Sequence, residues 1–179
     1  PLTSIAIQKI VNNVMEPMGW AGVMNLLVGS SRDVGEMLIH DRRAPLISAT
    51  GSCGMGRKIG GAVSKRLGRT LLELGGNNGI IVMPDADLDL ALRAVLFGAV
   101  GTSGQRCTTT RRLFLHNSVS EDITDRLVTA YGQVKIGDPL NDTTLMGPLV
   151  DDGAVKDYKE ALKIIEEQGG KILCGGNVL

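Results

Sequence analysis

Apolar and polar positions follow two different periods along the chain, and together they predict helices alternating with short strands. Apolar residues recur at three- and four-residue steps through residues 1–18, which indicates an amphipathic helix. A short, mainly apolar run at residues 23–28 ends at Gly29 and is typical of a strand. The pattern then predicts a brief helix, a strand, a helix and a second strand at residues 34–39, 45–49, 55–67 and 70–74. This alternation favours a parallel sheet with right-handed crossovers.

The pattern restarts after Gly75-Gly76. It predicts strands at residues 79–83, 109–116 and 171–174 and helices at residues 88–101, 121–135 and 151–168. The helix at 88–101 is apolar nearly all round, so we expect burial on most of its faces, with Asp89 and Arg93 pairing along its polar edge. In the helix at 151–168, the residues expected to face inward are Val155, Tyr158, Leu162 and Ile165.

We therefore expect an α/β fold with parts of two doubly wound lobes, residues 1–74 and residues 75–179. The two lobes share no sequence repeat. Each is predicted to have only three strands, which is few for a stable sheet, and the chain ends just after a Gly175-Gly176 turn. Both lobes are thus expected to be incomplete, as in an internal fragment, and the unpaired strand edges favour association into a homo-oligomer.

Composition excludes several classes of function. Nineteen basic residues balance nineteen acidic residues, so no charge pattern indicates a nucleic-acid partner. No uncharged apolar run approaches the roughly 20 residues that a membrane span needs, so no membrane partner is expected. Three widely spaced cysteines and two distant histidines support neither a disulfide framework nor a metal site. We expect a reducing compartment, the cytoplasm, or the mitochondrial matrix if the source is eukaryotic.

A glycine-rich loop joins a predicted strand to a predicted helix at residues 50–57, the position at which backbone N–H groups and the helix dipole favour phosphate. The loop has Arg57 and Lys58 where a Walker A motif would have Lys and Ser or Thr, and it lacks the GxGxxG order. Two interpretations stay open: a phosphate cradle, or a tight turn needed only for packing a helix on a strand.

The strongest candidates for chemistry are Cys107 and Glu73. A thiol is an intrinsically strong nucleophile, and a carboxylate can activate the water that clears a covalent intermediate. The alternative for a cysteine and a glutamate chosen at random is a small buried thiol and a surface carboxylate. Nearby arginines either supply a positive field for the thiolate or bind carboxylates or solvent: Arg106, Arg111 and Arg112.

Leu-Glu-Leu-Gly-Gly at residues 72–76 and Gly-Gln-Arg-Cys at residues 104–107 resemble the active-site motifs of the aldehyde dehydrogenase superfamily. The loop at residues 50–56 resembles that superfamily's Phe-Thr-Gly-Ser-x-x-x-Gly segment, with Ala49 in place of Phe. The resemblance implies a Rossmann-like cofactor lobe, a catalytic lobe, and NAD, with NADP as the alternative. It assigns these cofactor contacts: Thr50, Gly51, Ser52, Gly56, Leu74 and Gly75.

The same resemblance implies a mechanism in which Cys107 adds to an aldehyde, hydride leaves to the nicotinamide, and Glu73 activates water to hydrolyse the thioester. Asn77-Asn78 and the segment at residues 104–112 resemble the antiquitin branch, which oxidises α-aminoadipate semialdehyde in lysine breakdown. A phosphorylating or CoA-acylating relative is a second possibility, although Glu73 argues against CoA acylation. A third is a structural or assembly module without catalysis. Because the resemblance places further cofactor and oxyanion contacts outside residues 1–179, we expect no turnover by these residues alone.

Overall fold

The computed structural model describes residues 1–179 and has an α/β fold. It divides into two compact units, Pro1–Leu74 and Gly75–Leu179, which are described separately below. Unit 1 contains α1 (Leu2–Met15), a 3-10 turn η1 (Glu16–Met18), a π-helical turn η2 (Ser31–Gly35), α2 (Glu36–His40), β1 (Leu46–Gly51), α3 (Cys53–Lys65) and β2 (Arg69–Leu74). Unit 2 contains β3 (Asn78–Val82), α4 (Leu88–Val100), a 3-10 turn η3 (Gly101–Gly104), β4 (Thr110–Leu115), α5 (Asn117–Gly132) and α6 (Asp152–Glu167).

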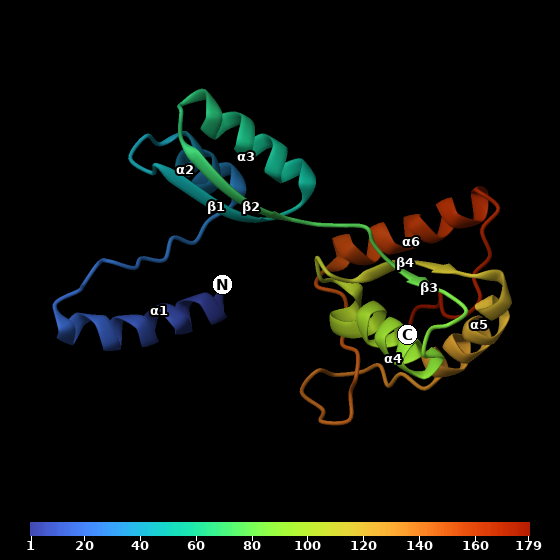
Figure 1. Cartoon of the computed structure of the whole chain (residues 1–179). Coiled ribbons are helices and arrows are strands. Elements are labelled where there is room, and N and C mark those ends of the chain that lie inside the picture. Colours follow the sequence, from blue (N-terminus) through green and yellow to red (C-terminus); the bar gives the residue numbers. More distant parts are fainter. The chain divides into compact units, whose positions relative to one another are not determined.

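Unit 1 is built on two parallel strands, β1 and β2, joined by the crossover helix α3 (Figure 1). Its core is a small aliphatic cluster from α2, β1 and α3: Ile39, Ile47, Ile59 and Val63. The guanidinium of Arg66 ties the end of α3 to this cluster, because its Nε donates to the Ile39 carbonyl at 2.9 Å and its Nη2 donates to the Ala44 carbonyl at 2.7 Å. The core therefore holds α3 and the start of β2 in a set position.

Unit 2 repeats the strand, helix, strand order with β3, α4 and β4, and the two strands are again parallel. Its core joins α4 to α5 through Val95, Ile123 and Leu127. Asp87 begins α4 because its carboxylate accepts hydrogen bonds from the N–H groups of Asp89 and Leu90. The segment between η3 and β4, which carries Cys107, is thereby attached to a packed helix on one side and to a strand on the other.

Two of the predicted strands are wrong. Residues 23–28 and residues 171–174 form no strand, and each unit has a two-stranded sheet rather than three strands. A strand exists only if a neighbouring strand pairs with its backbone, and an apolar run does not supply that neighbour. The other predicted helices and strands are present, with ends that differ by a few residues.

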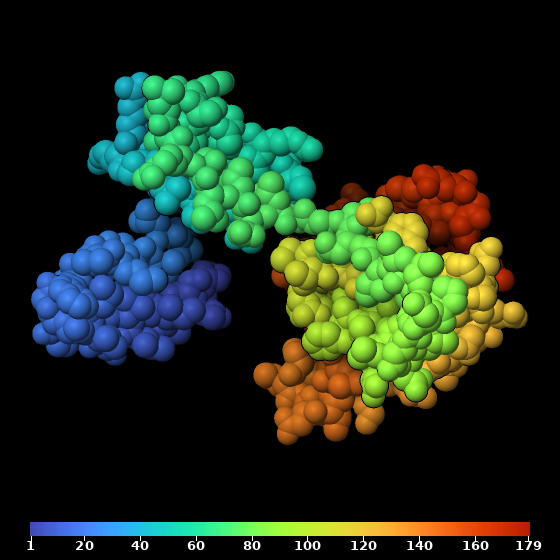
Figure 2. Space-filling view, in the orientation of Figure 1, coloured from blue at the N-terminus to red at the C-terminus, as the bar shows by residue number.

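Burial in unit 2 also differs from expectation. In α4 only Val95 is buried, and Leu90 and Phe97 are 60% and 70% exposed, because strands and α5 cover only part of the helix. Asp89 pairs with Arg126 of α5 rather than with Arg93. Helix α6 buries none of its residues, and Figure 2 shows it in red at the surface of unit 2. None of the helices combines the length and the apolar character needed to cross a bilayer.

Candidate active site

The glycine loop, defined here as residues 50–56, runs from the end of β1 into the first turn of α3. Ser52 is the residue that begins the helix, and its Oγ accepts a hydrogen bond from the N–H of Met55 at 3.1 Å. Gly51 leaves room for the Met55 side chain, since a Cβ at Gly51 would lie 2.4 Å from Met55 Cε. Both Thr50 and Ser52 are exposed, so the helix N-terminus is accessible to an anion.

Gly56 is buried in α3 and touches the last residue of β2. A Cβ at this position would lie 2.6 Å from both Leu74 Cδ1 and Leu74 Cδ2, closer than packed carbon atoms approach. The glycine is therefore needed for helix and strand packing, which is one of the two interpretations that the sequence left open. The phosphate interpretation is compatible with it, because dinucleotide-binding turns use one glycine for close helix to strand packing and others for the phosphate.

Glu73 lies beside the glycine loop. In the parallel ladder of β1 and β2, Thr50 is opposite Glu73 and Gly51 is opposite Leu74. Glu73 is exposed, and Gly75 follows it in an exposed position at the start of unit 2. In open α/β sheets, ligands bind beyond the carboxyl ends of the strands, and these residues occupy that end of the sheet. The register thus brings the predicted base and the predicted cofactor loop together within unit 1.

Cys107 lies in the nucleophile loop, defined as residues 101–109, and its side chain is exposed. The amide of Asn78, the first residue of β3, holds this loop. Asn78 Nδ2 donates to the carbonyl oxygens of Cys107 at 2.7 Å and Thr109 at 3.0 Å. Thr109 is only 4% exposed, and its Oγ1 accepts a hydrogen bond from the N–H of Arg106 at 3.1 Å. The backbone around the thiol is therefore fixed on both sides.

The first half of the nucleophile loop has an unusual backbone. Thr102, Ser103 and Gly104 have φ values of 55°, 54° and 70°, in the left-handed region that favours glycine. For each residue other than glycine this conformation costs roughly 1–2 kcal/mol, and it is uncommon for a β-branched residue such as Thr102. Strain of this kind persists where surrounding contacts hold it, and such positions cluster at functional sites.

The three arginines near Cys107 bind backbone carbonyl groups rather than carboxylates. The acceptors are the carbonyl oxygens of Phe97 at 3.2 Å for Arg106, Gly104 at 3.3 Å for Arg111, and Asn77 at 2.7 Å and 3.0 Å for Arg112. Arg106 also lies over the Phe97 ring, with Cζ 5.1 Å from the centroid, and its buried Nε has no hydrogen-bond partner. Their hydrogen bonds connect the nucleophile loop and β4 to α4 and to the segment before β3.

Shifted pKa values occur elsewhere in the chain. Hydrogen bonds from Arg43 lower the pKa of Asp41 to about 2, and the Lys58 ammonium lowers the pKa of Glu36. Burial raises the pKa of Tyr131. No disulfide joins the three cysteines, and no group of three or more His, Cys, Asp or Glu side chains is placed to hold a metal.

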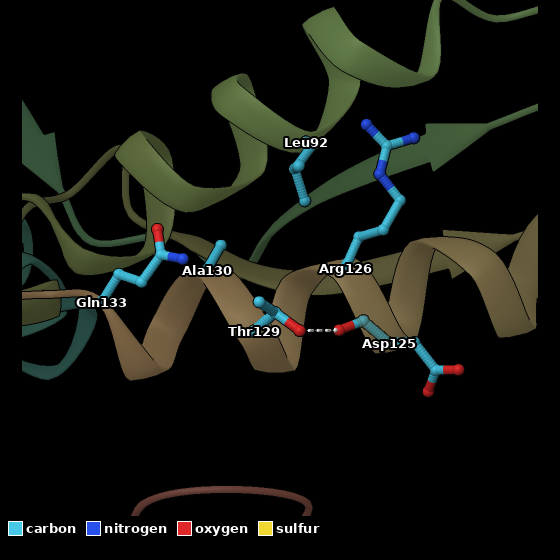
Figure 3. Close-up of a pocket in the computed structure, with 6 residues that line it drawn as sticks. All are labelled: Leu92, Asp125, Arg126, Thr129, Ala130 and Gln133. Carbon is cyan, nitrogen blue, oxygen red and sulfur yellow. Dashed lines mark hydrogen bonds between the residues drawn. The ribbon is translucent and has the colours of Figure 1, made fainter.

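An open hollow of about 370 Å³ lies between α4 and α5, and none of the predicted site residues lines it. Figure 3 shows its lining: Leu92, Asp125, Arg126, Thr129, Ala130 and Gln133. Thr129 uses its hydroxyl to donate to the carbonyl of Asp125 at 3.0 Å, and Arg126 is paired with Asp89. The Thr129 hydroxyl and the Arg126 guanidinium thus already have partners within unit 2.

Comparison with known proteins places these motifs in a family. The pattern that describes the aldehyde dehydrogenase family matches residues 1–179. An aldehyde dehydrogenase family 7 member A1 from Brassica napus is 49% identical over 179 residues, covering 100% of this chain and 36% of that protein. An alpha-aminoadipic semialdehyde dehydrogenase from Mus musculus is 44% identical over 178 residues, covering 99% of this chain and 33% of that protein.

Solved structures agree with the sequence comparison. A betaine aldehyde dehydrogenase from Staphylococcus aureus, crystallised with NAD+, is 28% identical with a TM-score of 0.93, covering 100% of this chain and 35% of that chain. HpcC from Thermus thermophilus is 30% identical with a TM-score of 0.86, covering 88% of this chain and 31% of that chain. The chain belongs to the aldehyde dehydrogenase family. It spans about a third of the length of the curated relatives that it matches.

The sequence did not reveal the residues that hold the site. Asn78 was visible only as part of an Asn-Asn pair, and Ser103 and Thr109 had no distinguishing pattern. Their hydrogen-bond partners lie in distant segments or depend on an irregular turn, so residue spacing carries no signal for them. The one available signal was Gly104 beside Gln105, a glycine next to a polar residue immediately before the candidate nucleophile.

Proposed function

We propose that the complete protein oxidises an aldehyde to a carboxylate with NAD, with NADP as the alternative cofactor. Cys107 is the nucleophile and Glu73 is the general base. The observation that carries this proposal is the register of β1 and β2, which sets Glu73 opposite Thr50 beside the glycine loop. In a two-step oxidation and hydrolysis the base must act at the carbon that has given its hydride to the cofactor, so a carboxylate beside the cofactor loop supports this role.

The chemistry begins at Cys107. Its sulfur, as thiolate, forms a bond to the aldehyde carbon, and the backbone N–H of Cys107 donates a hydrogen bond to the oxygen that becomes negative. A bound NAD would supply the acceptor for the hydride of this carbon, so that Cys107 would be left carrying the acyl group as a thioester. The bracing of the loop by Asn78 matters for this step because the reacting atoms must meet at a defined distance and angle.

Glu73 completes the reaction. Its carboxylate takes a proton from water, and the water oxygen attacks the thioester carbon, which breaks the carbon–sulfur bond and releases the acid. The thiol is then free for another cycle. For the cofactor, the residues that fit are the exposed Thr50 and Ser52, with Gly51 and Gly56 keeping the turn compact and Leu74 and Gly75 at the end of the adjacent strand.

For the substrate, we propose α-aminoadipate semialdehyde, and hence a role in lysine degradation. The support is the 44% identity with the alpha-aminoadipic semialdehyde dehydrogenase of Mus musculus, against 28% with the betaine aldehyde dehydrogenase. We further propose a homo-oligomer in the cytoplasm, or in the mitochondrial matrix if the source is eukaryotic. The short two-stranded sheets leave strand edges that other parts of the protein or other subunits can cover.

The test uses the complete protein with α-aminoadipate semialdehyde and NAD or NADP, and it measures reduced cofactor formed per enzyme. We expect turnover that Cys107→Ala abolishes and the matched variant Cys174→Ala preserves. Brief alkylation followed by peptide mapping should label Cys107 before the other two cysteines. Turnover by Cys107→Ala, or preferential labelling of Cys53 or Cys174, would exclude Cys107 as the nucleophile.

A structural or assembly module is the second candidate function, and one observation favours it. Helices α1 and α6 bury none of their residues and expose apolar side chains, which suits association. The complete protein would then bind partners or itself without oxidising any aldehyde. Residues 1–179 alone are expected to give no turnover under either candidate function, so the activity of the complete protein decides between them.

A further inference from the structure

A short segment far along the chain lies against the nucleophile loop. We call residues 147–150 the brace segment. Ser103 Oγ donates to the carbonyl of Gly147 at 2.6 Å. Gln105 Nε2 donates to the carbonyl of Pro148 at 3.4 Å, and Gln105 Oε1 accepts from the N–H of Val150 at 2.9 Å. The loop and the brace segment are 43–45 positions apart in sequence, so these contacts exist only in the folded unit.

The amide of Gln105 uses both of its ends. Besides its two contacts with the brace segment, Nε2 donates to the carbonyl of Thr102 at 3.1 Å. Gln105 therefore joins the strained part of the loop to the brace segment through one rigid planar group. A side-chain amide offers both a donor and an acceptor here, whereas an ionised glutamate has no donor and a leucine has neither.

We propose that Gln105 is a positioning residue, which keeps the nucleophile loop in its left-handed conformation and so presents the Cys107 thiol to the aldehyde. The inference rests on the proposed function of Cys107 as nucleophile. Gln105 lies two residues before Cys107, and Thr102 and Ser103, three and two residues before Gln105, occupy backbone conformations that relax unless held. The amide holds one of them directly and connects the loop to an outside support.

Loss of the Gln105 amide should affect one step, the addition of the Cys107 thiol to the aldehyde. Without the amide, the loop can leave its strained conformation, and the thiol and the backbone N–H of Cys107 lose their relative placement. Addition to a carbonyl needs that placement, whereas alkylation of a thiol by a small reagent does not. The hydrogen bonds of Gln105 all lie within unit 2, whereas the glycine loop proposed to bind the cofactor belongs to unit 1.

The experiment compares Gln105→Leu and Gln105→Glu with the unchanged complete protein. The control is Gln168→Leu, which changes an exposed glutamine after α6 whose side chain makes no hydrogen bond in the structure. The measurement is kcat per alkylatable Cys107, so that protein lost to misfolding does not count, together with the KM for NAD. Each lost hydrogen bond shifts an equilibrium by roughly two- to tenfold. We therefore expect kcat to fall by roughly tenfold or more in Gln105→Leu.

Gln105→Glu keeps the acceptor for the Val150 N–H and should fall between Gln105→Leu and the unchanged protein. The KM for NAD and the kcat of Gln168→Leu should stay unchanged. Unchanged kcat per reactive thiol in Gln105→Leu, or a KM for NAD that rises with it, would overturn the positioning role while leaving the proposed function intact. If instead Cys107→Ala retains turnover, the proposed function fails, and the inference fails with it.

Discussion

The glycine loop and the nucleophile loop are stabilised by different kinds of contact. In the glycine loop the stabilising hydrogen bond joins Ser52 to Met55, only three positions away, and the neighbouring strand supplies the rest of the frame. In the nucleophile loop the contacts join residues that are 29–45 positions apart, through Asn78, Ser103 and Gln105. One loop is formed by regular secondary structure, and the other is held in an irregular shape by distant side chains.

This difference in contacts follows from the groups that each loop would offer to a ligand, which are backbone N–H groups in one loop and a thiol in the other. A phosphate group is bound by backbone N–H groups, and the first turn of any helix already exposes several of them. A thiol that adds to a carbonyl must be held at a defined distance and angle, and here the side chains that hold its loop come from distant segments. We infer that local sequence is sufficient to build an anion cradle, whereas a nucleophile needs tertiary support.

The largest expected effect comes from removing the carboxylate beside the glycine loop while keeping the thiol of the nucleophile loop. Glu73→Gln in the complete protein removes the proposed base beside the glycine loop but leaves Cys107 in place, so an acyl group should accumulate on Cys107 when aldehyde and cofactor are supplied. Removing a general base slows its step by roughly 10²–10⁴-fold. Intact-mass measurement detects the adduct, and Glu167→Gln at the exposed end of α6 is the control. Unchanged turnover with no adduct would rule out Glu73 as the base.

The next largest effect is expected from disrupting the packing of α3 on β2, which supports the glycine loop. Gly56→Val should destabilise unit 1 by roughly 1–3 kcal/mol, because its side chain collides with Leu74. Gly61→Ala is the matched change in the same helix, where a Cβ meets nothing within 4 Å, and it should stabilise by roughly 0.5–1 kcal/mol. Urea unfolding measures both free energies. Equal signs for the two variants would contradict the packing role of Gly56.

A third prediction tests the strain in the nucleophile loop. Thr102→Gly should stabilise unit 2 by roughly 1 kcal/mol, since glycine adopts a φ of 55° without the steric cost of a β-branched residue. Thr102→Ala keeps a Cβ and should bring little or no such gain. The free energy of unfolding, measured in urea for both variants, decides between them. Destabilisation by the glycine variant would mean that the backbone is not strained at this position.

The smallest effect concerns an ion pair outside both loops. Arg43 Nη2 lies 2.6 Å from Asp41 Oδ2, and its hydrogen bonds lower the pKa of Asp41 from 3.8 to about 2. The stabilisation is therefore present above pH 3.8 and is lost as the pH falls through about 2. Arg43→Gln should return the pKa of Asp41 toward 3.8, as measured by NMR titration of its carboxyl carbon. Arg42→Gln is the neighbouring control and should leave this pKa unchanged.

Much of the secondary structure could be predicted from apolar periodicity. Strands β1 to β4 and helices α3 to α6 are where the pattern placed them, because each has a face or a run that packing requires. The strands expected at residues 23–28 and 171–174 failed because nothing pairs with them. The expected Asp89 to Arg93 pair also failed, since α5 brings Arg126 within reach of Asp89 and the pattern along a single helix contains no information about its neighbour.

The candidate site divides in the same way. The sequence by itself singled out Cys107 and Glu73 as candidates through their motifs, and it predicted the position of the glycine loop from a local strand, turn and helix order. Only the tertiary structure decided that Thr50 and Glu73 lie side by side, and that Asn78 and Gln105 hold the nucleophile loop. The physical reason is that hydrogen bonds between distant segments depend on the strand register and on the conformation of the loops. Neither can be read from the periodicity of apolar residues in the sequence.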